Sequence, residues 1–217
     1  MKSRVCIVVN IFVSSKCPIK SARALPDLLT ARMCLESAQI LCGAILNVAY
    51  GDSKSPSPLP KFIKVNWYKV KSPPYVRSLG QRKHPSILWA SKDRRHFEWV
   101  LEHMKALNDE YKLRYSKTID VLAYLKCYDY LKEHAYLIPK KSNYEIEFIA
   151  TITHANLLKD HWSVHRKYRV ALVHKYLYLY DREPTWKNCE PPQFLSNPNI
   201  IRYLRRVAGK PKRTLCI

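Results

Sequence analysis

The pattern of apolar positions predicts a helix over residues 26–49. Apolar side chains recur there every three or four residues, which gives a helix one continuous apolar face. That face consists of Leu28, Ala31, Leu35, Ala38, Cys42 and Ile45. Pro26 fixes φ in the first turn and Asp27 complements the exposed N–H groups, as is typical of a helix start. Only Arg32 and Glu36 carry charge in the rest of the stretch, so we expect this helix to be mostly buried.

The same spacing predicts further helices, and two other stretches have the pattern of strands. The additional helices cover 92–115 (with Ser91 as N-cap), 118–135 and 155–181. A β-branched run at 5–13 and an alternating stretch at 142–153 predict short strands. The expected fold class is therefore mainly α: a single helical domain of three to four long helices with a minor β element at the N-terminus.

Chain length and composition indicate one domain with appendages. At 217 residues and 47% hydrophobic content the chain can bury a core. We expect a helical core domain over 1–189, with a Pro- and Lys-rich excursion at 51–80, and a basic, Pro-rich C-terminal tail over 190–217. No apolar run approaches the ~18 residues of a membrane span, so no membrane is expected. Seven scattered cysteines without a C-x-x-C favour an intracellular, reducing compartment, and we expect a monomer.

Charge is the feature that points most directly to a partner. Lys and Arg number 38 against 17 Asp and Glu, a formal net charge of +21. Such an excess favours polyanions, with nucleic acid first and an acidic membrane surface second. Basic residues concentrate at 82–96 and at 201–213. We therefore expect DNA, duplex or single-stranded, as the partner.

The six basic residues at 82–84 and 94–96 lie within fifteen positions and favour an edge that contacts phosphate. The residues expected to bind nucleic acid are Arg32, Lys83, His84, Arg94, Arg95, Lys117 and Arg169. In the excursion, Phe62, Trp67 and Tyr68 alternate with lysines, a composition suited to single-stranded nucleic acid. A loop whose rings cover the core while its lysines stay in solvent explains the same pattern equally well.

Glu36 admits two interpretations. It lies four residues after Arg32, so the two side chains share one side of the helix and can form an internal ion pair. Alternatively, a carboxylate on a mostly buried helix is held in a cleft for acid–base chemistry.

Several other site types lack their sequence signatures. Only four glycines occur, too few and too scattered for a phosphate loop or a dinucleotide fingerprint, so no small-molecule cofactor is expected. His161 and His165 have the i,i+4 spacing of metal ligands, but no third ligand accompanies them, and no metal site is expected.

Several short motifs carry a resemblance to known proteins. In order they are NIFV (10–13), a helix ending in LESAQ (35–39), HPSILW (84–89), FEWVL (97–101), EYKLRYSK (110–117) and REPTW (182–186). The chain resembles uncharacterised proteins of bacteriophages and large DNA viruses. Those in turn look like distant relatives of the viral pyrimidine-dimer DNA glycosylases, which are small and all-helical. The glutamate on the first long helix and the REPTW ending are the points of similarity to the glycosylases.

The resemblance implies a specific chemistry. In the glycosylases the N-terminal amine attacks the sugar of a damaged nucleotide and forms an imine, supported by a glutamate at the position of Glu36. Arg32 lies near where that family keeps basic residues. The chain departs from the family at two points, because nine residues precede Asn10 and Leu29 stands where the family has histidine. An internal lysine such as Lys175 would then supply the amine, since a desolvated lysine can form an imine.

Three functions follow as hypotheses. The first is a DNA glycosylase or lyase that flips a nucleotide into a cleft beside Glu36, with Lys175 as the amine. The second is a nucleic-acid-binding protein without catalysis. The third is an interaction protein that docks on an acidic host partner.

Overall fold

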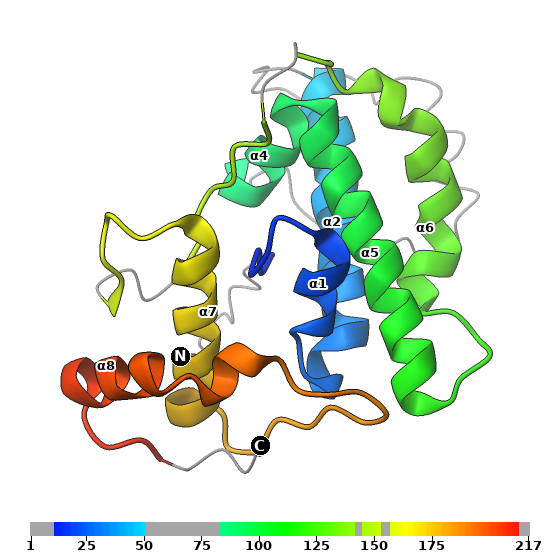
Figure 1. Cartoon of the computed structure of the whole chain (residues 1–217). Helices are drawn as coiled ribbons and strands as arrows, with labels where there is room; N and C mark the ends of the chain where they lie inside the picture. The colour runs from blue at the N-terminus through cyan, green and yellow to red at the C-terminus, as the bar shows by residue number, and fades with distance from the viewer. Residues whose placement is uncertain (1–10, 51–82, 142–144, 153–156, 213–217) are drawn as a thin grey trace, which may run out of the picture.

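The computed structural model describes residues 11–50, 83–141, 145–152 and 157–212. The regular structure in these ranges is helical, which confirms a mainly α fold class (Figure 1). The α-helices are α1 (Pro18–Arg23), α2 (Asp27–Tyr50), α4 (Pro85–Lys92), α5 (Arg94–Tyr115), α6 (Leu122–Glu133), α7 (Val164–His174) and α8 (Pro198–Ala208). The 3₁₀ helices η2 (His134–Leu137) and η5 (Gln193–Ser196) and the π-helical segment η4 (Lys175–Leu179) complete the described elements.

Two helices are long, and the expectation of three to four is not confirmed. α2 has 24 residues and α5 has 22, whereas α6 has 12. The helix predicted over 155–181 is shorter, because the Ser163 hydroxyl accepts from the Arg166 N–H and caps α7 only at residue 164. In the same way α5 begins two residues later than predicted, since its N-cap is Asp93 rather than Ser91.

The β elements are not confirmed either. Most of the stretch 5–13 lies outside the described residues, and residues 11–13 have no regular secondary structure. Residues 145–152 are also irregular, although Ile146 and Phe148 keep the alternating pattern. The carbonyl of Glu147 in this segment accepts a hydrogen bond from the Trp89 indole at 2.6 Å. A side chain thus takes up a backbone acceptor that a neighbouring strand would otherwise use.

The first helical layer is built around α2, which packs along α5 and is flanked by α4 and α6 (Figure 1). Leu29 of α2 is 2% exposed, but Leu28 is 65% exposed, so the buried face is rotated from the predicted one. Gly43 allows the close approach of α4, because a Cβ there would lie 2.7 Å from a methyl group of Ile87. The stretch Asp27–Val48 is long and apolar enough to cross a membrane, yet 72% of it is buried inside the protein, as in the core helix of a globular fold.

The second layer consists of α7, η4, η5 and α8, with α8 lying across α7 (Figure 1). Residues 11–17 connect it to the first layer. The His165 Nδ1 lies 3.1 Å from the Val13 carbonyl oxygen, and the Trp99 indole donates to the Lys16 carbonyl oxygen at 2.7 Å. Within the stretch that we expect to be a basic, Pro-rich tail from residue 190, Leu195 and Leu204 are fully buried. The apolar side of α8 faces the core, so α8 belongs to this layer.

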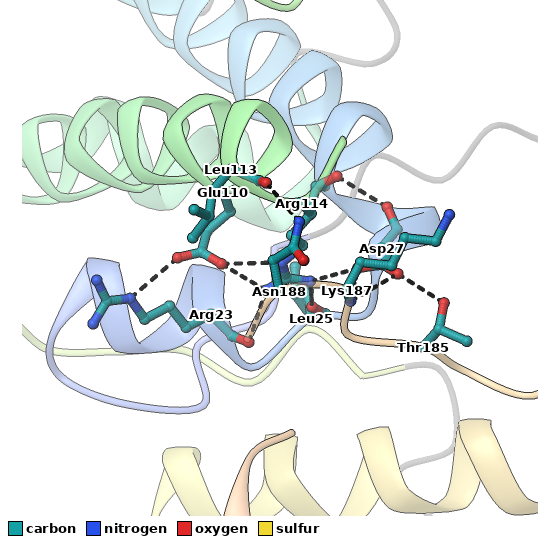
Figure 2. Close-up of polar contacts among 10 residues, drawn as sticks. Arg23, Leu25, Asp27, Glu110, Leu113, Arg114, Thr185, Lys187 and Asn188 are labelled. Carbon is teal, nitrogen blue, oxygen red and sulfur yellow. Dashed lines mark hydrogen bonds and ion pairs between the residues drawn. The ribbon is translucent and has the colours of Figure 1, made fainter. Parts of the chain in front are cut away.

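A buried ion-pair network ties α1, α2 and α5 to the segment after η4 (Figure 2). Arg114 is fully buried, and its Nη2 lies 2.8 Å from the Glu110 carboxylate. It also donates to the carbonyl oxygens of Leu25 and Arg23. Every charge in this cluster has a partner, as burial requires, so Arg114 is a structural residue.

Asp27 connects this network to the 182–186 motif. Its carboxylate accepts the Thr185 hydroxyl at 2.8 Å and the Lys187 N–H at 3.1 Å (Figure 2). The Thr185 carbonyl oxygen in turn accepts from the Asp27 N–H at 2.9 Å. The sequence predicts only that Asp27 complements the exposed N–H groups of the first turn. It also holds the chain after η4 against the start of α2.

Candidate active site at Lys175

Lys175 is the first residue of η4 and lies between the two layers. Its Nζ is 4.9 Å from the centroid of the Phe12 ring and 5.4 Å from that of Tyr180. Burial lowers the pKa of Lys175 below its usual 10.5, the nearby Arg32 lowers it further, and Glu36 opposes both effects. Burial and the nearby guanidinium thus favour the neutral amine more than water does, whereas the faces of the two rings attract the ammonium form.

Glu36 and Arg32 reach this site from α2. The Arg32 Nε lies 3.0 Å from the Glu36 Oε1, so the predicted helix-internal pair forms. The Glu36 side chain is 6% exposed, while that of Arg32 is 65% exposed. The fold also brings this pair close enough to Lys175 for both charges to affect its pKa. The ion pair therefore does not exclude the second interpretation, since the same carboxylate pairs with Arg32 and affects the pKa of the half-buried Lys175 amine.

Tyr180 forms another wall of the site. Burial raises the pKa of Tyr180 to about 12, Arg32 opposes this rise, and Glu36 adds to it. The phenol therefore stays protonated at neutral pH and can donate a hydrogen bond. Tyr180 also lines a cavity of about 260 Å³ together with Pro26, Leu28 and residues 181–185. Neither Lys175 nor Glu36 lines it, so the cavity adjoins the charged groups without containing them.

The chain widens into a single π-helical turn at Lys175. Tyr176 is fully buried, and the Tyr178 hydroxyl donates to the Gly209 carbonyl oxygen at 2.9 Å. The Tyr180 N–H returns to the Lys175 carbonyl oxygen at 3.0 Å, five residues back. Such wide turns occur mostly as single turns and are frequent at functional sites. The two tyrosines that follow Lys175 anchor this turn to the core and to the end of α8.

The predicted basic residues at 83–96 lie together around the start of α5, but most of them contact the protein itself. Arg94 donates to the carbonyl oxygens of Ile138 and Tyr136, and both Arg95 Nε and Nη2 donate to the Asp93 carboxylate. The His84 Nδ1 accepts from the Ser86 N–H and caps α4, and burial lowers the pKa of His84. Lys83 is exposed. Their role in phosphate binding stays a prediction.

Lys117 and Arg169 lie away from this cluster and from each other. Lys117 is exposed just beyond the end of α5, one helix length of roughly 33 Å from Arg94. The Arg169 Nε donates to the Ser14 carbonyl oxygen at 2.9 Å, and its guanidinium lies 6.0 Å from the centroid of the Phe194 ring. The predicted phosphate contacts therefore do not form one surface.

The structure reveals basic residues that the sequence prediction did not select individually. They are Lys159, Arg166, Arg202, Arg205 and Arg206, all exposed on or beside α7 and α8. The sequence signal of the four arginines is the absence of Asp and Glu from residues 161–180 and 191–217. A count of basic residues overlooks this signal, because it depends on where acidic neighbours are missing.

Metal binding finds no support within the described part of the chain, where no group of three or more His, Cys, Asp or Glu could hold a metal ion. The His165 ring is instead at hydrogen-bond distance from the Val13 carbonyl oxygen, and the His161 ring contacts Trp162 edge-on.

Comparison with known proteins assigns no family to the chain. No family model matches the sequence, and neither curated proteins nor solved structures give a match. The resemblance to viral proteins and to pyrimidine-dimer glycosylases stays a prediction that rests on the sequence motifs.

Proposed function

We propose that this protein binds DNA and uses the amine of Lys175 to form an imine with the sugar of a damaged or abasic nucleotide. The observation that carries the proposal is the position of Lys175, half-buried between aromatic rings, with its pKa lowered, and facing Glu36 of α2. Lysine amines that act as nucleophiles are activated by such desolvation and by a neighbouring cation.

The chemistry balances with groups that the chain supplies. The neutral Lys175 amine adds to the C1′ aldehyde of an abasic deoxyribose, and loss of water gives the imine. A carboxylate then takes the C2′ proton, and the C3′–O bond breaks to release the 3′ phosphate. Glu36 is the carboxylate assigned to that proton, while the largely exposed Arg32 guanidinium would contact a phosphate. In a glycosylase version of the reaction the same amine displaces the damaged base from C1′.

Lowering the pKa has a direct effect on the first step. A lysine with the usual pKa is only about 0.1% neutral near pH 7.4, and each unit by which the pKa falls raises that fraction tenfold. Arg32 lowers the pKa of Lys175 and Glu36 raises it. The two residues of the ion pair therefore tune the amine in opposite directions.

Borohydride trapping on an abasic duplex tests the proposal. Wild-type protein should become covalently attached to DNA, and Lys175→Arg should lose the adduct by at least tenfold while still binding. Lys187→Arg is the matched control, because Lys187 also lies over a ring, 5.6 Å from the Tyr115 centroid, but is exposed. An adduct that survives in Lys175→Arg would assign the amine to another residue and overturn this mechanism.

The pH profile of trapping provides a second criterion. Glu36→Gln removes the charge that raises the pKa of Lys175, so its trapping rate should reach half-maximum at lower pH than in the wild type. Arg32→Gln should shift the half-maximum to higher pH. Equal profiles for all three proteins would contradict the assigned roles, whatever their absolute rates.

A binding protein without catalysis is the second candidate, and one observation favours it. Leu29, which stands where the glycosylases have histidine, is 2% exposed and part of the core. A wild-type protein that shifts DNA but gives no adduct on abasic, mismatched or dimer-containing duplexes would select this function. Failure to bind any DNA at low salt would exclude both and leave an acidic protein partner.

A further inference from the structure

The surface formed by α7 and α8 carries positive charge, and neither helix contains an acidic residue, although the exposed Asp160 follows Lys159 in the chain. No Asp or Glu occurs over 161–180 or 191–217, although the chain has 17 of them. Arg202, Arg205 and Arg206 are exposed on α8, three and four residues apart, so they lie on one side of that helix. None of the three forms an ion pair with any residue that the structure describes.

Two aromatic rings hold further cations beside α8. The Trp162 and Tyr203 rings contact edge-on with centroids 4.9 Å apart. The Arg166 guanidinium lies 4.6 Å from the Trp162 centroid, and that of Arg206 lies 5.8 Å from the Tyr203 centroid. The Lys159 Nζ lies within 6 Å of both, at 5.9 and 5.7 Å. Contact with ring faces restricts these long side chains, which favours binding of a further anion because less rotamer freedom remains to be lost.

The rings themselves are not available for base stacking. Trp162 is 8% exposed, and Tyr203 is half-buried with its hydroxyl bonded to the Leu157 carbonyl oxygen at 2.9 Å. Single-strand binding proteins offer exposed rings to the bases, whereas contacts to a duplex backbone need only cations. The α7–α8 surface therefore fits a duplex better than a single strand.

The burial of the apolar side of α8 favours nucleic acid over a membrane as the partner of this surface. Leu204 is fully buried, and Ile200 and Tyr203 pack against the core. A helix that binds a membrane surface needs its apolar side free to enter the lipid. Since α8 has buried most of that side, with Val207 left 41% exposed, its cationic side is the larger surface that remains for a partner.

We propose that the α7–α8 surface, formed by Lys159, Arg166, Arg202, Arg205 and Arg206, binds the phosphate backbone of double-stranded DNA without reading its sequence. The inference rests on the proposed DNA binding but not on the chemistry of Lys175. Arg166 and Lys175 are nine residues apart along α7 and η4, about two and a half helical turns, so their side chains leave the helix on opposite sides. The surface is thus a contact separate from the Lys175 site.

The test is a salt titration of affinity for an undamaged duplex. The variant Arg202→Gln/Arg205→Gln/Arg206→Gln keeps good helix formers and removes three charges. The control Lys20→Gln/Lys132→Gln/Lys140→Gln removes three exposed charges elsewhere. The slope of log K against log salt should fall in magnitude by about 2 to 3 for the α8 variant, one step of roughly 0.9 per lost phosphate contact. The control slope should change by less than about 1.

The outcomes separate this inference from the proposed function. An α8 variant that keeps the wild-type slope, or a control that loses as much, would overturn the surface assignment while wild-type DNA binding stands. Stronger binding to single strands than to duplexes, or binding to acidic lipid vesicles in place of DNA, would also overturn it. Trapping at Lys175, measured with saturating abasic duplex, should be the same in the α8 variant and the wild type. Loss of trapping there would contradict the separation of the two sites.

Discussion

The two basic regions of this protein have similar sequences but different surroundings. Around the start of α5, Arg95 is paired with Asp93 at 3.0 Å, Lys92 lies 3.6 Å from Glu147, and Arg94 donates to two backbone carbonyl oxygens. On α8, Arg205 and Arg206 have no acidic partner among the described residues and lie on an exposed helix side. The first region uses its charge to hold α4 and α5 to residues 136–141 and to Glu147, whereas the second leaves its charge for a partner.

This difference shows that a count of basic residues does not measure the charge available for binding. An arginine that fills carbonyl and carboxylate acceptors of its own fold offers fewer donors to a phosphate, and its charge is partly compensated. Functional cations are better recognised where acidic residues are missing nearby. The predictions below divide the basic residues by what their loss affects, stability or binding.

Arg114 is the basic residue whose loss should lower the stability of the fold most. Arg114→Met removes the buried cation from Asp27 and leaves Glu110 with only the largely exposed Arg23, and breaking such a buried pair costs about 3–5 kcal/mol. Urea unfolding should show this loss in the free energy of unfolding. Arg23→Gln is the control, because Arg23 pairs with the same Glu110 but its side chain is 68% exposed, and it should cost about 1 kcal/mol or less. Equal losses would contradict the distinction.

Asp93 should stabilise the start of α5 by an intermediate amount. Asp93→Ala removes the N-cap, and such a change costs about 1–2 kcal/mol. The hydrogen bond from the Arg95 side chain holds the pKa of Asp93 at about 2, burial opposes it, and the Arg95 and Lys141 N–H groups support it.

The pH dependence of this effect has a definite sign. Since the pKa of Asp93 in the folded protein lies below the usual 3.8, its charged form stabilises the fold. That contribution is complete above about pH 4 and is lost as the pH falls toward 2. The difference in free energy of unfolding between wild type and Asp93→Ala should narrow over this window. Asp129→Ala, at an exposed position of α6, should show no such narrowing.

The smallest expected effect is on DNA binding by the α5 edge. Arg94→Gln/Arg95→Gln and Arg205→Gln/Arg206→Gln each remove two charges, so they form a matched pair. The α8 pair should reduce the salt slope by about 2, and the α5 pair by less than about 1, because its guanidiniums already donate to the protein. Equal reductions of the salt slope, measured side by side, would show that Arg94 and Arg95 contribute to DNA binding as much as the α8 pair does.

The sequence by itself determined the helices whose signals are local. Apolar spacing within a few turns placed α2 and α5 almost at their observed ends, because side chains three and four residues apart share a helix face regardless of the rest of the chain. It also identified Glu36 as an unusual carboxylate, since charge is rare on that helix. Spacing did not locate the strands correctly, because an alternating pattern needs a neighbouring strand, and the 145–152 segment packs against Trp89 instead.

Only the tertiary structure decided which distant residues meet. The sequence motifs suggested Glu36 and Lys175 separately, but the packing of η4 beside α2 and Phe12 is what lowers the pKa of Lys175. In the same way, the sequence alone does not distinguish Arg95 from Arg205, because each is an arginine in a basic cluster. Burial and partners come from contacts between residues far apart in the chain, and these contacts set whether a charge supports the fold or remains available for a ligand.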